Sequence, residues 1–354
     1  MTALAEVLKR QIAATGPLTL ADYMTACLMH PDHGYYTTRD PLGAAGDFTT
    51  APEISQMFGE LLGLCLAQGW LDQGAPDPFT LAELGPGRGT LMADVLRATR
   101  AVPGFQDAAE IHLVEASPTL RKEQAKRLSD HHAHWHDTVD TLPDAPLFLI
   151  ANEFFDALPI RQFTRHGNGW RECVVGLAEG RLAPGLTDTA PQDVVRHRLE
   201  DTRDGDIVET CAPAQGIAAT LGARIARFGG AALLIDYGDW RSKGDTLQAL
   251  ENHAPADPFA HPGQADLTAH VDFEAIACAA APARHSRLTP QGVFLERLGI
   301  VRRAQALAGN LSGAALQSHI TAHRRLTHPS EMGSLFKILA LFPEGASPPP
   351  GLDT

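Results

Sequence analysis

The sequence lacks the positive charge and the long apolar runs that mark nucleic-acid-binding and membrane-spanning proteins. Its 354 residues carry 29 Lys and Arg against 42 Asp and Glu, a formal net charge of −13. Phosphate backbones are bound by a basic field, so we expect no nucleic acid as the main partner. No stretch approaches the roughly 20 apolar residues that a bilayer span needs, so we also expect no membrane span.

Cysteine and metal-ligand patterns are sparse as well. The chain has five cysteines, and no pair has the C-x-x-C spacing of a redox or zinc motif. Histidines cluster at residues 131–136, but no cysteine or matched set of acids stands beside them, so we expect no metal site. The first residues lack the apolar core of a signal peptide and include Glu6. Together with reduced thiols, this predicts a cytoplasmic protein.

The most informative stretch joins an apolar run to a glycine-rich turn. Residues 79–84 carry a single acid and are followed by Gly85, Gly87 and Gly89, and then by a helix-forming segment. Because glycine has no Cβ, this strand–turn–helix pattern lets the backbone approach a ligand closely. A second apolar run ends in Glu115, at the position where parallel α/β folds bind ribose hydroxyls. The two anchors indicate a ligand that contains adenosine.

Details of the turn separate the possible adenosine ligands. A dinucleotide fold requires glycine three residues after Gly87, and Thr90 stands there. Glu83 precedes the turn, and its carboxylate would repel a pyrophosphate in the same crevice. S-adenosyl-L-methionine has no phosphate, its sulfonium and ammonium suit an acid, and its carboxylate suits a helix N-terminus. The pattern favours a methyltransferase over a nicotinamide enzyme or an ordinary tight turn.

Apolar strands and helical segments alternate through the chain and predict an α/β fold with a mostly parallel sheet, covered on both faces. We expect strands at residues 79–84, 111–115, 134–136, 147–152 and 231–236, with helices at 90–101, 118–129 and 213–228. The core would comprise residues 76–156 and 213–345. Three additions are expected: an N-terminal helical extension with a covering loop (1–75), an insertion with a β-hairpin (157–212) and a further insertion (238–272).

Polar residues at the carboxyl ends of the strands are the candidates for binding and catalysis. The fourth strand runs into Asn152 and Glu153, and Asp156 follows three residues later. That interval predicts a helical turn with both acids on one side, where they could hold a guanidinium or a lysine, or cap the turn. Asp137 could reach an adenine edge or cap a helix, and His270 offers a possible base.

Motifs along nearly the whole chain resemble those of one family. They are GDFTTAPEISQ at 46–56, ELGPGRGTLM at 83–92, VEASPTL at 114–120, NEFFDALP at 152–159, LIDYG at 234–238 and DLTAHVDF at 266–273. In this order they resemble the MidA-like class I methyltransferases, whose mitochondrial members assist the assembly of respiratory complex I. The resemblance implies a Rossmann-like class I fold, with an N-terminal helical extension and insertions after strands four and five.

The resemblance also implies a cofactor, an acceptor and site residues. The cofactor would be S-adenosyl-L-methionine, with the loop at residues 46–56 lying over it, and the acceptor would be a protein arginine, as in the mitochondrial members that methylate a complex I subunit. Without a targeting presequence, a bacterial cytoplasmic member is expected. An assembly chaperone that binds the cofactor and a small-molecule methyltransferase stay open as alternatives. The expected cofactor-binding residues are Glu83, Gly85, Gly87, Gly89, Glu115, Asp137, Asn152, Thr50 and Gln56, and the expected catalytic residues are Glu153, Asp156 and His270.

Overall fold

The computed structural model describes residues 2–38, 50–251 and 253–354, which divide into two compact units. The first, here called the sheet unit, comprises residues 49–155, 216–239 and 273–354. The second, here called the insertion unit, comprises residues 1–48, 156–215 and 240–272. Residues 46–49 of the expected covering loop lie outside the described residues.

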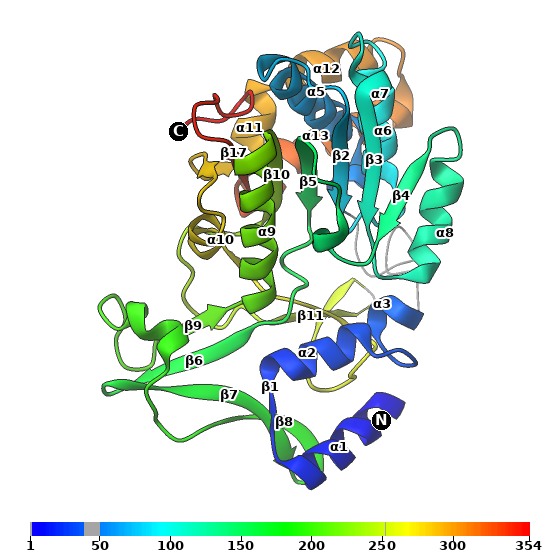
Figure 1. Ribbon diagram of the computed structural model, residues 1–354. Helices are drawn as coiled ribbons and strands as arrows, with labels where there is room; N and C mark the ends of the chain where they lie inside the picture. The colour runs from blue at the N-terminus through cyan, green and yellow to red at the C-terminus, as the bar shows by residue number, and fades with distance from the viewer. Residues whose placement is uncertain (1, 39–49, 252) are drawn as a thin grey trace. The chain divides into compact units, whose positions relative to one another are not determined.

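The sheet unit is built on a mostly parallel sheet (Figure 1). Its parallel strands lie in the order β10, β5, β2, β3, β4, and β17 pairs with β10 in the antiparallel direction. The strands are β2 (Phe79–Leu84), β3 (Ala109–Val114), β4 (Ala133–His136), β5 (Leu147–Asn152), β10 (Gly230–Asp239) and β17 (Phe336–Phe342), with the short β15 (Arg284–His285) and β16 (Thr289–Pro290) beside β17. The predicted α/β fold of the class I type is confirmed.

The strand order reverses between β2 and β5. From β2 the chain proceeds outward to β3 and β4, and it then returns to add β5 on the other side of β2. In open α/β sheets, ligands bind outside the carboxyl ends of the strands at such a reversal. We therefore expect ligand-binding residues in the segments that follow β2, β3 and β5.

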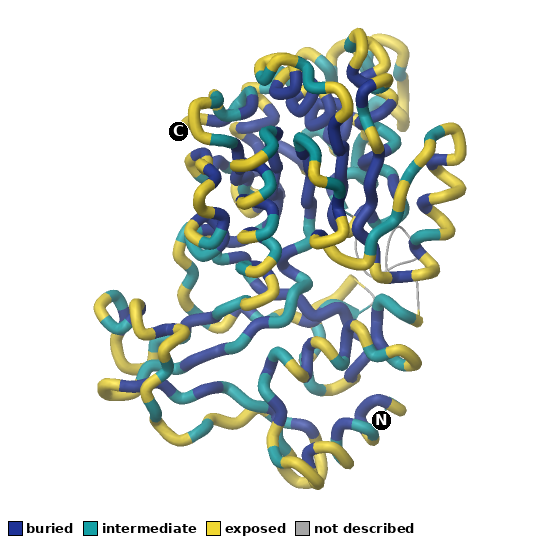
Figure 2. The backbone as a smooth tube through the Cα atoms, viewed as in Figure 1, coloured by how far each residue is buried: buried dark blue, intermediate teal, exposed yellow. Residues whose placement is uncertain are grey.

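Buried apolar side chains line both the strands and the helices of this unit. Every residue of β2 and β5 is buried, as Figure 2 shows for the central strands, because both faces of a parallel sheet are covered. Helix α5 packs against α6 and against both β5 and β10. The helices are α4 (Ala51–Ile54), α5 (Gln56–Asp72), α6 (Thr90–Thr99), α7 (Phe105–Ala108), α8 (Pro118–Arg127), η1 (Val139–Thr141), α9 (Ala212–Phe228), α10 (Phe273–Ala279), α11 (Gln291–Arg297), α12 (Ile300–Ala308), α13 (Gly313–Thr327) and α14 (Met332–Leu335).

The insertion unit combines helices with two small sheets. One sheet has the order β1, β7, β6, β9, with β8 beside β7, and it contains the predicted hairpin, in which His166 pairs with Gly169. The other has the order β12, β11, β13. The elements are α1 (Ala3–Thr15), β1 (Leu18–Thr19), α2 (Leu20–Met29), α3 (Tyr35–Thr38), β6 (Arg161–His166), β7 (Gly169–Ala178), β8 (Arg181–Leu186), η2 (Asp193–Arg198), β9 (Ile207–Thr210), β11 (Gln248–Glu251), β12 (Ala254–Ala256), β13 (Asp266–Thr268) and β14 (Val271–Asp272).

The segments expected as separate additions to the core are grouped differently in the structure. The sequence was divided into three separate additions, whereas the N-terminal segment and both insertions form one unit. Strand β1 pairs with β7, and residues of α1, α2, β7, β8 and β13 share one apolar core. Residues from 49 onward, including α5, belong instead to the sheet unit. In neither unit does a described helix have the length and apolar character needed to cross a bilayer.

Candidate functional site

Three polar residues at the ends of adjacent strands share one face of the sheet. Glu83 of β2 stands opposite Leu113 of β3 and Ile150 of β5. Side chains two residues apart along a strand point to the same face, so Glu115 and Asn152 lie on the face of Glu83. The structure thus brings three of the residues predicted from the sequence to one edge of the sheet.

The turn between β2 and α6 has the left-handed backbone that its glycines permit. The φ angles are 58° at Gly85, 53° at Gly87 and 76° at Gly89. A Cβ on Gly85 would lie 2.8 Å from Cδ2 of Phe154, which is closer than side chains pack. Gly89 is the N-cap of α6 and contributes no side chain to its first turn. Polar groups from elsewhere must therefore meet the N–H groups of that turn.

Glu83 meets one of these N–H groups from within the sheet. Its carboxyl group is only 3% exposed and accepts a hydrogen bond from the main-chain N–H of Met92, in the first turn of α6. The other oxygen, Oε2, is buried without a hydrogen-bond partner among the described residues. Burial, reinforced by the nearby Glu115, raises the pKa of Glu83 to about 8. The carboxyl group of the free protein is therefore mostly protonated at neutral pH.

Glu115 is fixed by Gln124 of α8, a residue that the sequence did not reveal. The N–H of Ser117 donates to Glu115 Oε1 over 2.8 Å, and Gln124 Nε2 donates to Oε2 over 3.1 Å. The same amide group donates to the carbonyl oxygen of Gly87 over 2.8 Å and accepts from Trp135 Nε1 over 2.8 Å. Burial raises the pKa of Glu115, although the hydrogen bonds from Ser117 and Gln124 act to lower it.

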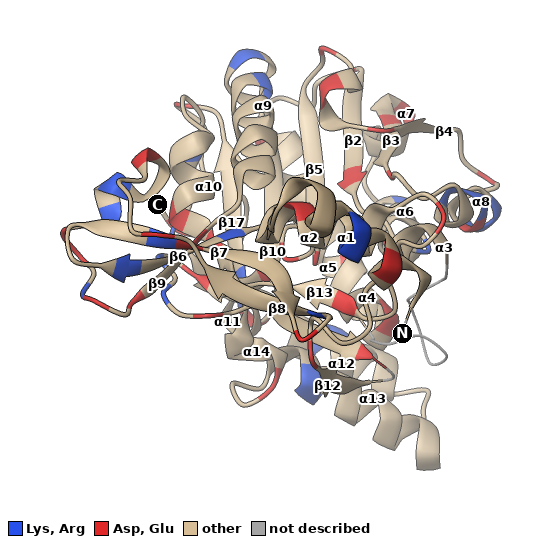
Figure 3. Ribbon diagram, turned by 90° about the horizontal axis from the view of Figure 1, so that it is seen from below, with Lys and Arg blue, Asp and Glu red and all other residues tan. Residues whose placement is uncertain are grey.

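A signal for Gln124 was present in the helix pattern. Leu120 and Gln124 are the buried residues of α8, and they lie four apart on one side of the helix. The lysines and arginines of α8 stand out in Figure 3 as a basic segment of the chain. An uncharged amide at core spacing in so charged a helix indicates a buried polar contact.

Asp137 lies at the surface, next to the third strand. Its side chain is 86% exposed, and Arg121 Nη2 lies 2.5 Å from Asp137 Oδ1. Arg121 also donates to the main-chain oxygens of Glu115, over 2.7 Å, and His136, over 3.0 Å. Arg121 thereby joins the ends of β3 and β4. The contact of Asp137 with an adenine edge stays a prediction.

The segment after β5 does not form the predicted helical turn. Glu153 has a φ of 51°, in the left-handed region that a glutamate rarely adopts, and no helix follows it. The expectation that Glu153 and Asp156 stand on one side of a helical turn is therefore wrong. The main-chain N–H groups of Phe154 and Phe155 instead donate to Asp236 Oδ2 over 3.2 and 2.9 Å, so a buried aspartate of β10 shapes the segment.

The Glu153 carboxylate holds the start of helix α4. Its Oε1 accepts from the N–H of Ala51 over 3.0 Å and from Asn152 Nδ2 over 3.1 Å. The carboxylate therefore meets the N-terminus of a helix distant in the sequence, and not the turn after β5 that the sequence suggested it could cap. Asn152 is 8% exposed, and its Oδ1 has no hydrogen-bond partner among the described residues.

Helix α4 also reaches the helix that follows the glycine turn. Thr90, the first residue of α6, donates from Oγ1 to Glu53 Oε1 over 2.5 Å. With the contact between Ala51 and Glu153, α4 therefore bridges the segments that follow β2 and β5. Thr50 occupies the N-cap of α4 without a side-chain capping bond, and Gln56 turns its amide to Glu60 over 3.2 Å. Cofactor contacts by Thr50 and Gln56 stay predictions.

Asp156 and His270, the other predicted catalytic residues, belong to the insertion unit. Asp156 is buried, and its carbonyl oxygen accepts from the N–H of Ala269 over 2.9 Å. The main-chain N–H of His270 donates to Thr246 Oγ1 over 2.9 Å. These contacts place Asp156 beside the segment of His270. Their sharing a site with Glu153 stays a prediction.

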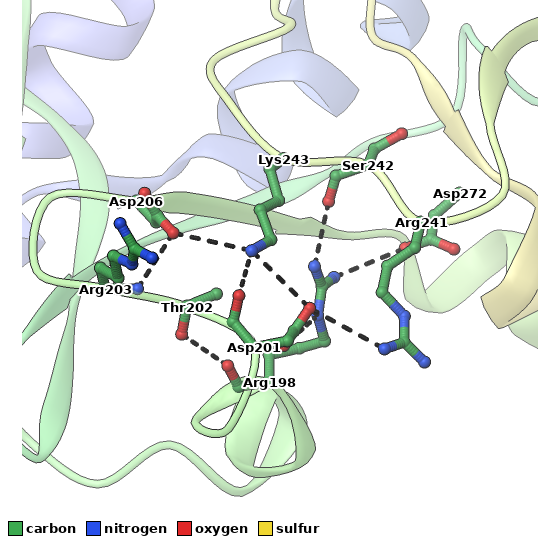
Figure 4. Close-up of polar contacts among 9 residues, drawn as sticks. All are labelled: Arg198, Asp201, Thr202, Arg203, Asp206, Arg241, Ser242, Lys243 and Asp272. Carbon is green, nitrogen blue, oxygen red and sulfur yellow. Dashed lines mark hydrogen bonds and ion pairs between the residues drawn. The ribbon is translucent and has the colours of Figure 1, made fainter.

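The buried Arg198 is the centre of a group of polar contacts that reaches Asp272, close to His270 in the sequence (Figure 4). Arg198 is 2% exposed, and its Nε lies 3.1 Å from both carboxylate oxygens of Asp201. Its Nη1 lies 3.9 Å from Asp272 Oδ2, two residues beyond His270, and its Nη2 donates to the carbonyl oxygen of Ser242 over 3.4 Å. Arg198 thus joins η2 to two segments of the second insertion.

The histidines of β4 contact the neighbouring strand. His112 Nδ1 lies 2.8 Å from His136 Nε2, and the rings of His112 and His134 stack with centroids 5.1 Å apart. Burial, with the neighbouring histidines, lowers the pKa of His112 to about 4. Across the described ranges no group of three or more potential ligands is arranged to hold a metal ion.

Comparisons with known proteins agree with this geometry. Residues 61–291 match a family model described as a putative S-adenosyl-L-methionine-dependent methyltransferase. The chain is 36% identical over 375 residues to the mitochondrial protein arginine methyltransferase NDUFAF7 homolog of Drosophila melanogaster, covering 96% of this chain and 85% of that protein. It is 36% identical over 367 residues to human NDUFAF7, also named a mitochondrial protein arginine methyltransferase, covering 94% of this chain and 82% of the human protein.

A solved structure is similar over almost the whole chain. It is a protein of Burkholderia thailandensis bound to S-adenosyl-homocysteine, with a TM-score of 0.82 and 29% sequence identity. The similarity covers 99% of this chain and 93% of that chain.

Proposed function

We propose that this chain, which belongs to a family of S-adenosyl-L-methionine-dependent methyltransferases, methylates arginine side chains of proteins. It is a methyltransferase, and S-adenosyl-L-methionine is its cofactor. The observation that supports arginine as the acceptor is the 36% identity, over 96% of the chain, to a protein named as a protein arginine methyltransferase.

The residues at the ends of β2, β3 and β5 fit this cofactor, which supplies a methyl group on a positively charged sulfur. Glu83 Oε2 and Asn152 Oδ1 are buried acceptors without donors among the described residues, and they suit the cofactor's ammonium. The carboxylate of Glu115 accepts hydrogen bonds from Ser117, Gln124 and Ala116, and carboxylate oxygens have room for a further donor such as a ribose hydroxyl. Gly85 and Gly87 let the backbone approach it, and Gln124 fixes the turn to Glu115.

The acceptor chemistry calls for a carboxylate. An arginine keeps its proton in solution, so its attacking nitrogen must lose a proton as the bond to the methyl carbon forms. A carboxylate that orients the guanidinium can accept this proton. Holding the acceptor nitrogen next to the methyl group of the cofactor supplies most of the rest of the rate enhancement. Glu153 is our first candidate, and Asp156 and His270 are the candidates from the insertion unit.

The family resemblance supports a narrower proposal for the partner. The acceptor would be an exposed arginine of a subunit of the respiratory complex I type, or of another protein. We expect the reaction to take place in the cytoplasm.

Transfer of label to protein tests the proposed function. The purified chain is incubated with S-adenosyl-L-methionine labelled in its methyl group and a lysate of cells that lack it. We expect a labelled protein band, and none with Gly87→Val, because a valine would be strained at a φ of 53° and would block backbone approach.

Two outcomes would contradict the proposal. If the chain binds S-adenosyl-homocysteine but labels no protein, an assembly chaperone that uses the cofactor only for its shape becomes the better account. If label appears only in the low-molecular-mass fraction, the enzyme acts on small molecules.

A further inference from the structure

Two buried acceptor oxygens lie at the ends of neighbouring strands. Glu83 Oε2 of β2 and Asn152 Oδ1 of β5 are both without a hydrogen-bond partner among the described residues. Their side chains are more than nine-tenths buried, and the register of β2 and β5 places them on one face. Buried polar groups are normally satisfied, so two buried oxygens without partners on one face indicate a ligand that completes their hydrogen bonding.

Among the described residues, no basic side chain acts on the pKa of Glu83. From β3 it faces Glu115, from α6 the N–H of Met92, and from β5 the uncharged amide of Asn152. Two further carboxylates of the sheet unit have other partners, since Glu53 accepts from Thr90 and Glu153 accepts from Ala51. Within the described ranges the main-chain N–H of Met92 is the donor that Glu83 meets, and the charged group that acts on it is Glu115.

We propose that Glu83 of the free protein carries a proton, and that this proton leaves to solvent when the cofactor's ammonium is bound beside Glu83. The ammonium then donates to the newly charged Glu83 carboxylate and to Asn152 Oδ1. The inference concerns cofactor recognition alone and holds whatever the methyl acceptor is.

The sign of the pH dependence follows from the two states. Burial and Glu115 raise the pKa of Glu83 to about 8 in the free protein, and a bound positive charge lowers it. The complex therefore holds fewer protons than the free protein between its own lower pKa and about pH 8. In that window the affinity for the cofactor increases with pH, at most about tenfold per pH unit, and it levels off above the window.

Calorimetry measures the released proton directly. Wild-type protein is titrated with S-adenosyl-homocysteine near pH 7 in phosphate and in Tris, which differ in ionisation enthalpy. We expect the heats to differ by the equivalent of nearly one proton released for each ligand bound. A second probe, 5′-methylthioadenosine, lacks the ammonium and should release none.

Two variants identify the source of the proton. Glu83→Gln should release no proton, whereas Glu110→Gln, at an exposed position of β3, should behave as wild type. Heats in wild type that are independent of the buffer would overturn the proposal. Equal release by wild type and Glu83→Gln would also overturn it, because the ligand's own ammonium would then be the source.

The unfolding of the free protein gives a second, independent readout. A carboxyl group with a raised folded-state pKa contributes stability below its unfolded pKa and loses it as the pH rises through the folded value. The melting temperature of wild type should therefore fall relative to that of Glu83→Gln between about pH 4.5 and pH 8. Parallel pH profiles would overturn the proposal even if Glu83→Gln binds no ligand.

Discussion

The backbone conformation of Glu153 determines which groups its carboxylate contacts. Its φ of 51° turns the chain at the end of β5, and its carboxylate meets the N-terminus of α4. A left-handed conformation costs a non-glycine residue about 1–2 kcal/mol, and here the hydrogen bonds from Ala51 and Asn152 offset it. The residue is therefore an anchor of the structure as well as the candidate proton acceptor.

Replacing Glu153 by glutamine separates these two roles. The amide oxygen of Glu153→Gln can still accept from Ala51, so we expect a folded protein with nearly unchanged affinity for S-adenosyl-homocysteine. Because an amide cannot take up the proton of a guanidinium, the rate of label incorporation should fall about 100-fold or more. Initial rates and calorimetric affinities, with Glu110→Gln as the matched control, measure both. An unchanged rate would leave Glu153 the anchoring role alone.

At the scale of elements, two helices hold the ends of three strands together. Helix α4 bridges the segments after β2 and β5, and α8 joins the glycine turn to Glu115 and Trp135 through Gln124. They fix the backbone that the cofactor is expected to meet.

Gln124→Leu tests this positioning. The change keeps the apolar bulk but removes the amide, so the indole N–H of Trp135 and the carboxylate of Glu115 each lose a partner. We expect a loss of about 2–3 kcal/mol in the free energy of unfolding and roughly tenfold weaker binding of S-adenosyl-homocysteine. Denaturant unfolding and calorimetry measure these effects. The neighbouring exposed Glu123→Leu should change neither, and equal effects of the two variants would contradict a positioning role for Gln124.

Elements marked by local features of the sequence could be predicted, whereas those fixed by contacts distant in the sequence could not. Strands β2 and β5 have the predicted bounds because a continuous apolar run ends abruptly in a glycine turn or in polar residues. Gln124 was not predicted because its signal, the four-residue spacing from Leu120, belongs to no binding motif. The conformation of Glu153 escaped prediction because it is imposed by Asp236 and Ala51, which are distant in the sequence.

At the scale of the whole molecule, the chain builds its insertion unit from three separated segments. Local patterns predicted the hairpin of β6 and β7 and several helices, but not that β1 of the N-terminal segment pairs with β7. That pairing joins residues more than a hundred positions apart and has no local signal. The candidate cofactor residues at the ends of β2, β3 and β5 lie in the sheet unit, whereas Asp156 and His270 lie in the insertion unit.

The identity of the methylated residue tests the central claim most directly. Protein labelled by the wild-type chain is hydrolysed, and its labelled amino acids are separated by chromatography beside methylated standards. We predict that the label elutes with methylated arginine, and that protein from the Gly87→Val reaction carries none. Label in methyl-lysine, in a carboxyl methyl ester or in no amino acid at all would contradict an arginine methyltransferase.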